Sequence, residues 1–207
     1  MANSTTIYLL RHAESQHNVT KDFSLRDPGL TPLGITQATA LRTTFPALSS
    51  IGLIISSPLT RTIETTIAAF DPIISSGQAK LILDPLLQER SDLPCDIGSE
   101  LSDLKERFPG LGFNDWEKVL EEGWWTKAGL FAADDETVRK RAGEVRRKLL
   151  GCVKELEGKE RKYIVVVTHG VFMKFLAEDE EIDLAKAGWR GYKAVEKEDG
   201  EVGLIEI

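Results

Sequence analysis

Residues 7–13 read Ile-Tyr-Leu-Leu-Arg-His-Ala, a short apolar run that ends in two polar side chains and an alanine. Residues 163–170 show the same pattern, Tyr-Ile-Val-Val-Val-Thr-His-Gly. Both apolar runs are too short for a helix and contain residues that favour strands, so each predicts a buried strand. Two further short apolar runs share this character. The predicted strands are residues 7–10, 53–55, 81–83 and 163–167.

Segments with helical signals separate these strands. Residues 31–45 begin with Thr31-Pro32, and proline suits the first turn of a helix because its nitrogen needs no partner there. Residues 59–70 follow Ser57-Pro58 in the same way. We therefore expect both segments to be helices.

The longest predicted helix is residues 136–156. Its apolar side chains recur every three or four positions opposite a charged face, with Asp134 or Asp135 as the cap. We expect the basic residues of this segment to form its solvated side and not a nucleic-acid site. The alternation of strands and helices along the chain indicates an α/β fold.

Residues 88–130 differ in composition from the rest of the chain, with scattered proline, glycine and tryptophan. We expect an insertion of helix and loop that folds over the active site and selects the substrate, within one domain spanning residues 1–207. Four aromatic side chains of this segment form either an apolar wall of the substrate site or part of the core. They are Phe113, Trp116, Trp124 and Trp125.

The overall composition is that of a globular protein. The 207 residues include 26 basic and 33 acidic side chains, a formal net charge of −7, so we expect neither nucleic acid nor membrane as a partner. No apolar run approaches the roughly 18 residues that a membrane span needs. Residues 1–15 do not resemble a secretory signal, and Cys95 and Cys152 lack the spacing of a disulfide framework or a zinc site. We expect a cytoplasmic protein without metal or cofactor.

Two of the three histidines, His12 and His169, directly follow predicted strands. Ligands of open parallel sheets bind at the carboxyl ends of the strands, so we expect both imidazoles to point into one crevice. Small residues follow each of them, Ala13 and Gly170, and leave room for backbone N–H groups to approach an anion. The alternative is two unrelated polar residues in loops at strand ends.

Two arginines are expected to share this crevice. Arg11 precedes His12, and Arg61 opens the predicted helix after the second strand. Guanidinium groups bind phosphate oxygens in pairs and stay charged at all relevant pH, so two arginines beside two histidines suit a dianion. A surface position on its helix is the alternative for Arg61.

The sequence resembles the histidine phosphatase superfamily, also called the phosphoglycerate mutase-like family, whose first motif reads Arg-His-Gly-x-Ser/Thr-x-x-Asn. Residues 11–18 here read Arg-His-Ala-Glu-Ser-Gln-His-Asn. Four more patches match the family in its order and extend the resemblance over most of the chain. These patches are residues 30–38, 56–62, 87–89 and 167–170.

The resemblance implies a fold, a three-layer α/β/α sandwich with a mainly parallel central sheet, and a site. It implies that His12 is the nucleophile and forms a phosphohistidine with a phosphate ester of a small molecule. Positive charge then stabilises the transferred group without a metal. The residues implied to hold the phosphoryl oxygens are Arg11, Arg61 and His169, and those implied to bind the substrate around it are Ser15, Asn18 and Gly170.

Glu89 matches the proton donor of the family, and a partly buried carboxyl there has a raised pKa that suits the task. The alternative from the residues alone is a surface ion pair with Arg90 or Arg107. Two departures from the family pattern stand out. Ala13 replaces a glycine, and residues 91–96 read Ser-Asp-Leu-Pro-Cys-Asp instead of the stretch with tyrosine and glycine found in the phosphoglycerate mutases.

The second departure favours hydrolysis over mutase activity, because a mutase must retain its phosphorylated intermediate while a hydrolase admits water. Our leading hypothesis is a metal-independent phosphatase of small phosphate esters. The alternatives are a phosphoglycerate mutase-type phosphotransferase and a catalytically silent phosphate-binding module. The sequence predicts neither the particular ester nor the oligomeric state.

Overall fold

The computed structural model describes residues 5–111, 120 and 123–207. Six of its strands form one sheet in the order β3-β2-β4-β1-β5-β6. The first four of that order are parallel to one another, and the last two are antiparallel. The strands are β1 (Ile7–Arg11), β2 (Ile51–Ser56), β3 (Lys80–Leu83), β4 (Tyr163–Thr168), β5 (Trp189–Glu196) and β6 (Val202–Glu206).

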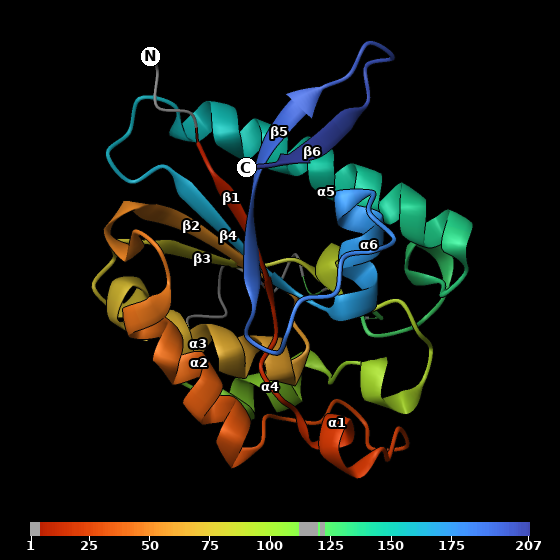
Figure 1. Ribbon diagram of the computed structural model, residues 1–207. Coiled ribbons are helices and arrows are strands. Elements are labelled where there is room, and N and C mark those ends of the chain that lie inside the picture. Colours follow the sequence, from red (N-terminus) through yellow and green to blue (C-terminus); the bar gives the residue numbers. More distant parts are fainter. Residues whose placement is uncertain (1–4, 112–119, 121–122) are drawn as a thin grey trace.

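Helices cover both faces of the sheet (Figure 1), with α2 and α3 on one face and α5 and α6 on the other. The α-helices are α1 (Gln16–Thr20), α2 (Pro32–Thr44), α3 (Thr60–Ser75), α4 (Leu101–Arg107), α5 (Asp135–Leu156) and α6 (Gly170–Ala177). Short 3-10 turns are η1 (Leu48–Ser50), η2 (Pro85–Leu87), η3 (Pro94–Asp96) and η5 (Gly129–Phe131). The predicted three-layer α/β/α fold is confirmed.

Two apolar cores follow from the alternation of side chains along the strands. In β4, Val165 and Val167 pack toward α2 and α3, while Ile164 and Val166 pack toward α5 and α6. All four side chains are fully buried. A strand whose two faces are both covered reads as a continuous apolar run, which is why β4 was predictable from the sequence.

The helix starts follow capping chemistry. The Thr31 hydroxyl accepts a hydrogen bond from the Gly34 N–H at 3.0 Å, with Pro32 in the first turn of α2. Asp134 caps α5 in the same manner through the Thr137 N–H at 3.0 Å. Both starts lie within one residue of their predicted positions.

The predicted end of the second helix, residue 70, is wrong, because α3 continues through Pro72 to Ser75. Pro72 has no N–H to donate to the carbonyl four residues earlier, which is the carbonyl of Ala68. The Arg42 side chain supplies the missing donor, with its Nε 2.6 Å from the Ala68 oxygen. The helix therefore passes its proline, and the residues beyond it pack against the core.

The prediction that the basic residues of α5 form a solvated face is wrong for two of them. Arg141 is fully buried and Arg146 nearly so. Each donates to backbone carbonyls of other segments, Arg141 to Leu86 and Arg146 to Val202. A guanidinium is tolerated in a core when carbonyl oxygens satisfy its donors.

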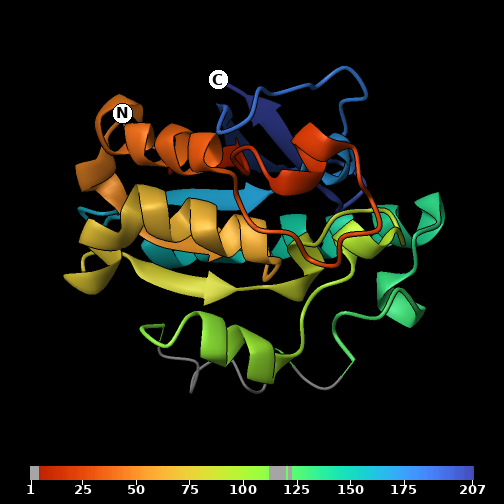
Figure 2. The same cartoon turned by 90° about the horizontal axis from the view of Figure 1, so that it is seen from below.

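The carboxyl ends of the four parallel strands all lie on the same side of the molecule. The arrowheads of β3 and β4 point to the same side in Figure 2, where α1 also lies. Within the described part of the chain, no helix combines the length and apolar character needed to cross a bilayer.

Candidate active site

The two histidines predicted to converge do so at the carboxyl ends of β1 and β4. Arg11 pairs with Thr168 in the sheet register, and the His12 N–H donates to the Thr168 carbonyl at 3.0 Å. The next residues along each strand, His12 and His169, have their ring centroids 5.2 Å apart. Both rings are buried, with 3% and 0% of the residue exposed. The alternative of unrelated strand-end residues is therefore wrong.

The hydrogen bonding of His12 defines its tautomer. Its Nδ1 lies 2.7 Å from the Ala13 carbonyl oxygen, which can only accept, so the ring proton is on Nδ1. Nε2 then carries a lone pair. Burial, and then the positive charges of Arg61 and Lys186, hold the pKa of His12 well below its ordinary value. The ring is neutral at physiological pH.

His169 is held from the neighbouring strand-end loop. Its Nε2 lies 2.9 Å from the Ser57 hydroxyl oxygen, whereas its Nδ1 is buried without a hydrogen-bond partner among the described residues. Burial, followed by the charge of Arg61, also lowers the pKa of His169 well below its ordinary value. A buried nitrogen without a partner costs free energy, which a ligand can recover.

Arg61 lies in the first turn of α3 with 1% of its surface exposed. Its Nη1 donates to the Cys95 carbonyl at 2.7 Å, and its Nη2 pairs with the Asp96 carboxylate at 2.6 Å. Its Nε is buried and has no partner in the described structure. The alternative of a surface position for Arg61 is wrong.

Arg11, the last residue of β1, reaches the same region. Its Nη1 donates to Asp183 at 3.0 Å and to the Leu184 carbonyl. Gly170 is required for this placement, because a Cβ added there would lie 2.9 Å from the Arg11 Cζ. The predicted substrate-binding residue Gly170 thus makes room for Arg11.

Glu89 lies against the N-terminal end of α6 and is buried, with 9% of its surface exposed. Its carboxylate accepts backbone N–H bonds from Val171 at 3.2 Å and Phe172 at 2.9 Å. Burial, and then the negative charge of Asp96, raise the pKa of Glu89 above its ordinary value, against the lowering effect of its hydrogen bonds.

The alternative of a surface ion pair for Glu89 is wrong. Arg90 pairs with Asp135, and Arg107 pairs with Glu64. Arg90 contacts the Glu89 carboxylate through its backbone N–H, at 2.8 Å, and not through its guanidinium.

Ser15 and Asn18 form a small network around the third histidine, His17. The Ser15 hydroxyl donates to the Asn18 side-chain oxygen at 3.0 Å, so it accepts from His17 Nδ1 at 3.1 Å. His17 Nε2 then accepts from the Asn18 amide at 3.0 Å. Burial is the main reason that the pKa of His17 falls to about 4, so this ring stays neutral as well. Asn18 and His17 line the cavity described below. Ser15 is not on its lining and binds both side chains through its hydroxyl group.

This arrangement matches a known family over most of the chain. The sequence model of the histidine phosphatase superfamily (branch 1) matches residues 7–193. The chain belongs to the histidine phosphatase superfamily.

Relatives and solved structures agree with this membership. A probable phosphatase of Schizosaccharomyces pombe is 32% identical over 186 residues, which cover 86% of this chain and 82% of that protein. A phosphoglycerate mutase-like protein of Arabidopsis thaliana is 28% identical over 204 residues, 81% of this chain and 72% of that protein. The structure of a mycobacterial glucosyl-3-phosphoglycerate phosphatase with VO3 has a TM-score of 0.63 at 20% identity, covering 98% of this chain and 97% of that chain.

Six of the predicted site residues line one cavity of about 330 Å³: Arg11, His12, Asn18, Arg61, Glu89 and Gly170. His169 and Ser15 lie behind them and are not on its lining. Its lining also includes charged and polar residues outside the predicted set, among them His17, Asp96 and Lys186. Asp96 and Lys186 belong to no motif, so only the fold reveals their position. The exposed apolar side chains on the lining of the cavity are Phe23, Leu93 and Val171.

Of the two alternatives for the aromatic side chains, the core role is confirmed for Trp124 and Trp125. Trp124 is buried in the core with 2% of its surface exposed, and Trp125 packs against that core. Neither lines the cavity of this histidine phosphatase. Phe113 and Trp116 lie outside the described residues.

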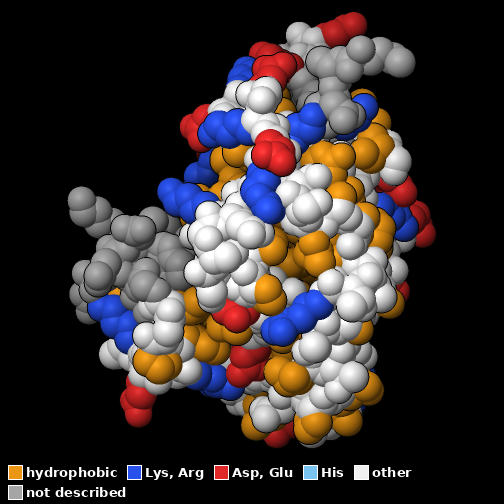
Figure 3. Space-filling model, turned by 90° about the vertical axis from the view of Figure 1, so that its left-hand side faces the viewer, with side chains coloured by type: hydrophobic (Ala, Val, Ile, Leu, Met, Phe, Trp, Pro, Cys, Tyr) orange, Lys and Arg blue, Asp and Glu red, His pale blue; other side chains and the backbone are white. Residues whose placement is uncertain are grey.

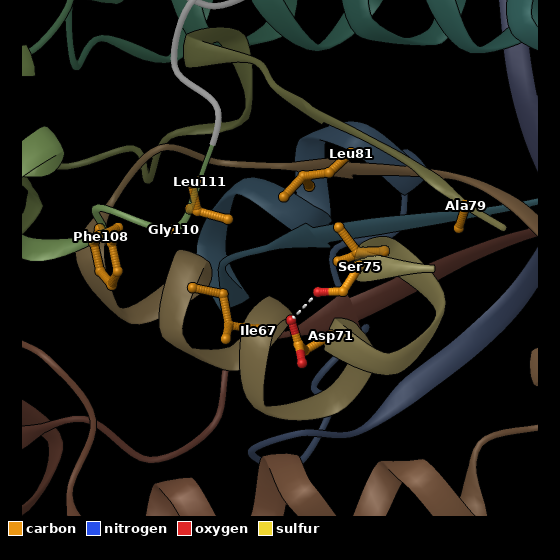
Figure 4. A pocket seen from close by; sticks show the side chains of 9 residues that line it. Ile67, Asp71, Ser75, Ala79, Leu81, Phe108, Gly110 and Leu111 are labelled. Carbon is orange, nitrogen blue, oxygen red and sulfur yellow. Dashed lines mark hydrogen bonds between the residues drawn. The ribbon is translucent and has the colours of Figure 1, made fainter. Parts of the chain in front are cut away.

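A second cavity, of about 570 Å³, lies between α3, β3 and the segment after α4 (Figure 4). Its lining is mainly apolar, from side chains such as Ile67, Leu81 and Phe108, and its Asp71 accepts a hydrogen bond from Ser75 at 2.6 Å. Among the described residues, its lining includes no histidine or arginine. The larger of the two cavities is therefore not the candidate active site.

The histidines of the site are internal. On the face shown in Figure 3, hydrophobic, basic and acidic side chains are interspersed, and no histidine colour shows among the described residues drawn there. Burial is the main cause of the lowered pKa of all three imidazoles.

Proposed function

We propose that this histidine phosphatase hydrolyses phosphate monoesters of small molecules through a phosphohistidine at His12, without a metal ion. The observation that carries the proposal is the fixed tautomer of His12. Its Nδ1 donates to the Ala13 carbonyl, so the Nε2 lone pair is available in a cavity that also contains Arg11 and Arg61. An imidazole is a nucleophile only in this neutral form.

In the first step, His12 Nε2 attacks phosphorus and forms a P–N bond while the ester P–O bond breaks. The electron pair of that bond stays on the leaving oxygen, which takes a proton from the Glu89 carboxyl. The raised pKa of Glu89 supports this role, because the carboxyl holds its proton to a higher pH than an ordinary glutamic acid does.

Fixed donors stabilise the charge that spreads over the phosphoryl oxygens. Arg61 offers its partnerless Nε–H, and Arg11 offers donors of its guanidinium that do not face Asp183. His169 Nε2 and the Ser57 hydroxyl share a hydrogen bond, and the buried Nδ1 has no partner among the described residues. We propose that Ser57 donates in this bond, so that the ring proton is on Nδ1 and binds a phosphoryl oxygen.

In the second step, water attacks phosphorus and the P–N bond breaks. Glu89, now a carboxylate, takes a proton from the water, and the electron pair of the P–N bond returns to His12. Phosphate leaves and the starting protonation state is restored. Arginines supply the positive charge of both steps, and we propose that part of residues 88–130 selects the ester, since Ser91 and Leu93 line the cavity.

Phosphate release from a panel of esters tests this proposal. The panel includes sugar phosphates, glycerate phosphates, nucleotides and aromatic phosphates, each with and without EDTA. We expect the parent protein to release phosphate in both conditions and His12→Ala to release none. Transfer of the phosphoryl group only to a second metabolite, and not to water, would instead indicate the mutase-type reaction. Loss in EDTA with recovery on adding Mg²⁺ would contradict the metal-free mechanism.

A further inference from the structure

The loop between α6 and β5 is attached to the strand that carries the nucleophile. The Arg11 N–H donates to the Gly188 carbonyl at 3.0 Å, and the Ala187 N–H approaches the His12 carbonyl at 3.4 Å. The Arg11 side chain also donates to the Leu184 carbonyl. Three contacts therefore hold residues 184–188 beside the end of β1.

The turn in this loop has a strained backbone. Ala187 has a φ of +57°, a left-handed conformation that a residue with a side chain seldom adopts. The Gly188 N–H closes the turn on the Ala185 carbonyl at 2.8 Å, and a Cβ at Gly188 would lie 2.8 Å from that oxygen. Strain of this kind persists where the surroundings impose it, and it is concentrated at functional sites. Its effect here is to place Lys186 on the lining of the active-site cavity.

Lys186 is half-buried, and its ammonium group has no hydrogen bond or ion pair within the part of the chain that the structure describes. The charged groups around it come from several elements. Arg11 of β1, Arg61 of α3 and Lys21 after α1 repel it, and Glu89 attracts it. Asp183, the acidic residue of its own loop, is engaged by Arg11.

The other four cations on the lining already have partners. Arg61 is paired with Asp96, Arg11 with Asp183 and Arg90 with Asp135, and the Lys174 ammonium donates to the Glu180 carbonyl. A half-buried ammonium without an opposing charge is unfavourable until an anion arrives. Among the described residues of the lining, Lys186 is thus the cation that has neither a hydrogen bond nor an ion pair, and its charge is left for a ligand.

We propose that Lys186 binds the phosphoryl group of the substrate, as a third cation beside Arg11 and Arg61. The inference rests on the proposed function for the identity of the group, and it adds a binding residue from outside the matched motifs. The Nζ–H donors form a charge-assisted hydrogen bond with a phosphoryl oxygen, which is stronger than a neutral one.

Lys186 gives the binding of phosphate a pH signature. Burial, and then the charges of Arg11 and Arg61, lower the pKa of Lys186 to about 8 in the unliganded protein. The charged form is present below that pH and is lost above it, so the affinity for the phosphoryl group falls as the pH rises past about 8. The loss is expected in KM more than in kcat.

Three variants test the proposal: Lys186→Met, Lys186→Arg and, as the matched control, Lys21→Met. Lys21 is an exposed lysine near enough to act on Lys186 but absent from the cavity lining. The probe is inorganic phosphate, whose dissociation constant is measured by calorimetry and by competitive inhibition, with circular dichroism to verify folding.

We expect Lys186→Met to weaken phosphate binding by about 10- to 100-fold, the loss of one charge-assisted hydrogen bond. Lys186→Arg should recover most of the affinity and move its decline at alkaline pH upward, because guanidinium does not deprotonate in this range. Lys21→Met should stay within about twofold of the parent.

Unchanged phosphate affinity in a folded Lys186→Met protein overturns the proposal. If the KM of esters still rose in that protein, Lys186 would bind another part of the substrate. A parent protein that hydrolysed no ester but bound phosphate in a Lys186-dependent manner would refute the proposed function and retain this site. A parent that bound no phosphate would overturn both.

Discussion

Asp96 interacts with both Arg61 and Glu89, the proposed acid of the site. Its carboxylate pairs with Arg61 Nη2 at 2.6 Å and accepts from the Ser91 hydroxyl at 2.6 Å. Its negative charge also raises the pKa of Glu89. One side chain therefore orients Arg61, which we propose to bind phosphate, and keeps the neighbouring carboxyl protonated to a higher pH.

Asp96→Asn should lower the pKa of Glu89, because a neutral amide no longer opposes its ionisation. The acid form of Glu89 is needed to protonate the leaving group, so the alkaline limb of kcat/KM for alkyl phosphates should move to lower pH. Asp92→Asn is the control, since Asp92 is exposed and does not line the cavity. Superimposable pH profiles of the parent and Asp96→Asn would refute this electrostatic role.

Glu89→Gln separates proton donation from binding. Esters with poor alkoxide leaving groups need a proton, whereas p-nitrophenyl phosphate hardly needs one. We expect turnover of alkyl phosphates to fall by about 10²- to 10⁴-fold, with a much smaller loss in the phosphorylation step for p-nitrophenyl phosphate. Pre-steady-state release of p-nitrophenol should show a burst, because water attack loses its base.

Equal damage to both classes of ester without a burst would mean that Glu89 only shapes the cavity through its bonds to Val171 and Phe172.

Single residues were predictable where a motif carried them. His12 and His169 follow strands, and their convergence follows from parallel pairing alone. Asp96 and Lys186 carry no such signal, because each reaches the cavity by the course of an irregular loop. The burial of Arg141 was also missed, although its position carries a signal: it lies three residues after Val138 and four before Val145, on the apolar face of the helix.

At the scale of elements, α5 supports the active site from a distance. Arg141 donates from Nη1 to the carbonyls of Leu86 at 2.7 Å and Gln88 at 2.6 Å, directly before Glu89. Its guanidinium also lies over the Phe172 ring, 4.4 Å from the centroid. One buried side chain thus joins α5, the segment before Glu89 and the first turn of α6, which binds the Glu89 carboxylate.

Arg141→Leu should lower the free energy of unfolding by about 3 kcal/mol, because two buried carbonyls lose their donor. Urea denaturation followed by circular dichroism measures this change. Lys140→Leu is the matched control on the same helix; its side chain is 71% exposed and pairs only with Glu136 among the described residues, so a change within about 0.5 kcal/mol is expected. Equal effects of the two substitutions would show that Arg141 does not stabilise this junction.

The elements that the sequence did not predict are short or half-exposed. α1 has five residues and α6 eight, too few for a helical period to repeat. β5 and β6 form an antiparallel edge with charged residues among apolar ones, such as Lys193 and Glu196, and so lack the continuous apolar run of a doubly covered strand. The helices around the buried strands were predictable because their capping residues and their apolar periodicity indicate the same segments.

Over the whole molecule, the two apolar cores place the chemistry at one edge of the sheet. β1 and β4 are the central pair, covered on both faces, so the residues that follow them are held by rigid elements. Loops from far along the chain then complete the site, with Glu89 from the segment after β3 and Lys186 from the segment before β5. The account as a whole depends on His12 as the nucleophile in this cavity.

The measurement that tests this claim most directly is the isolation of the covalent intermediate. The protein is mixed with a ³²P-labelled ester, quenched in alkali within one turnover and digested for mass spectrometry. We predict acid-labile, alkali-stable phosphate on His12 that forms and decays at rates compatible with turnover, and none in His12→Ala. Phosphate on another residue, or His12→Ala turning over at the parent's rate, would contradict the account.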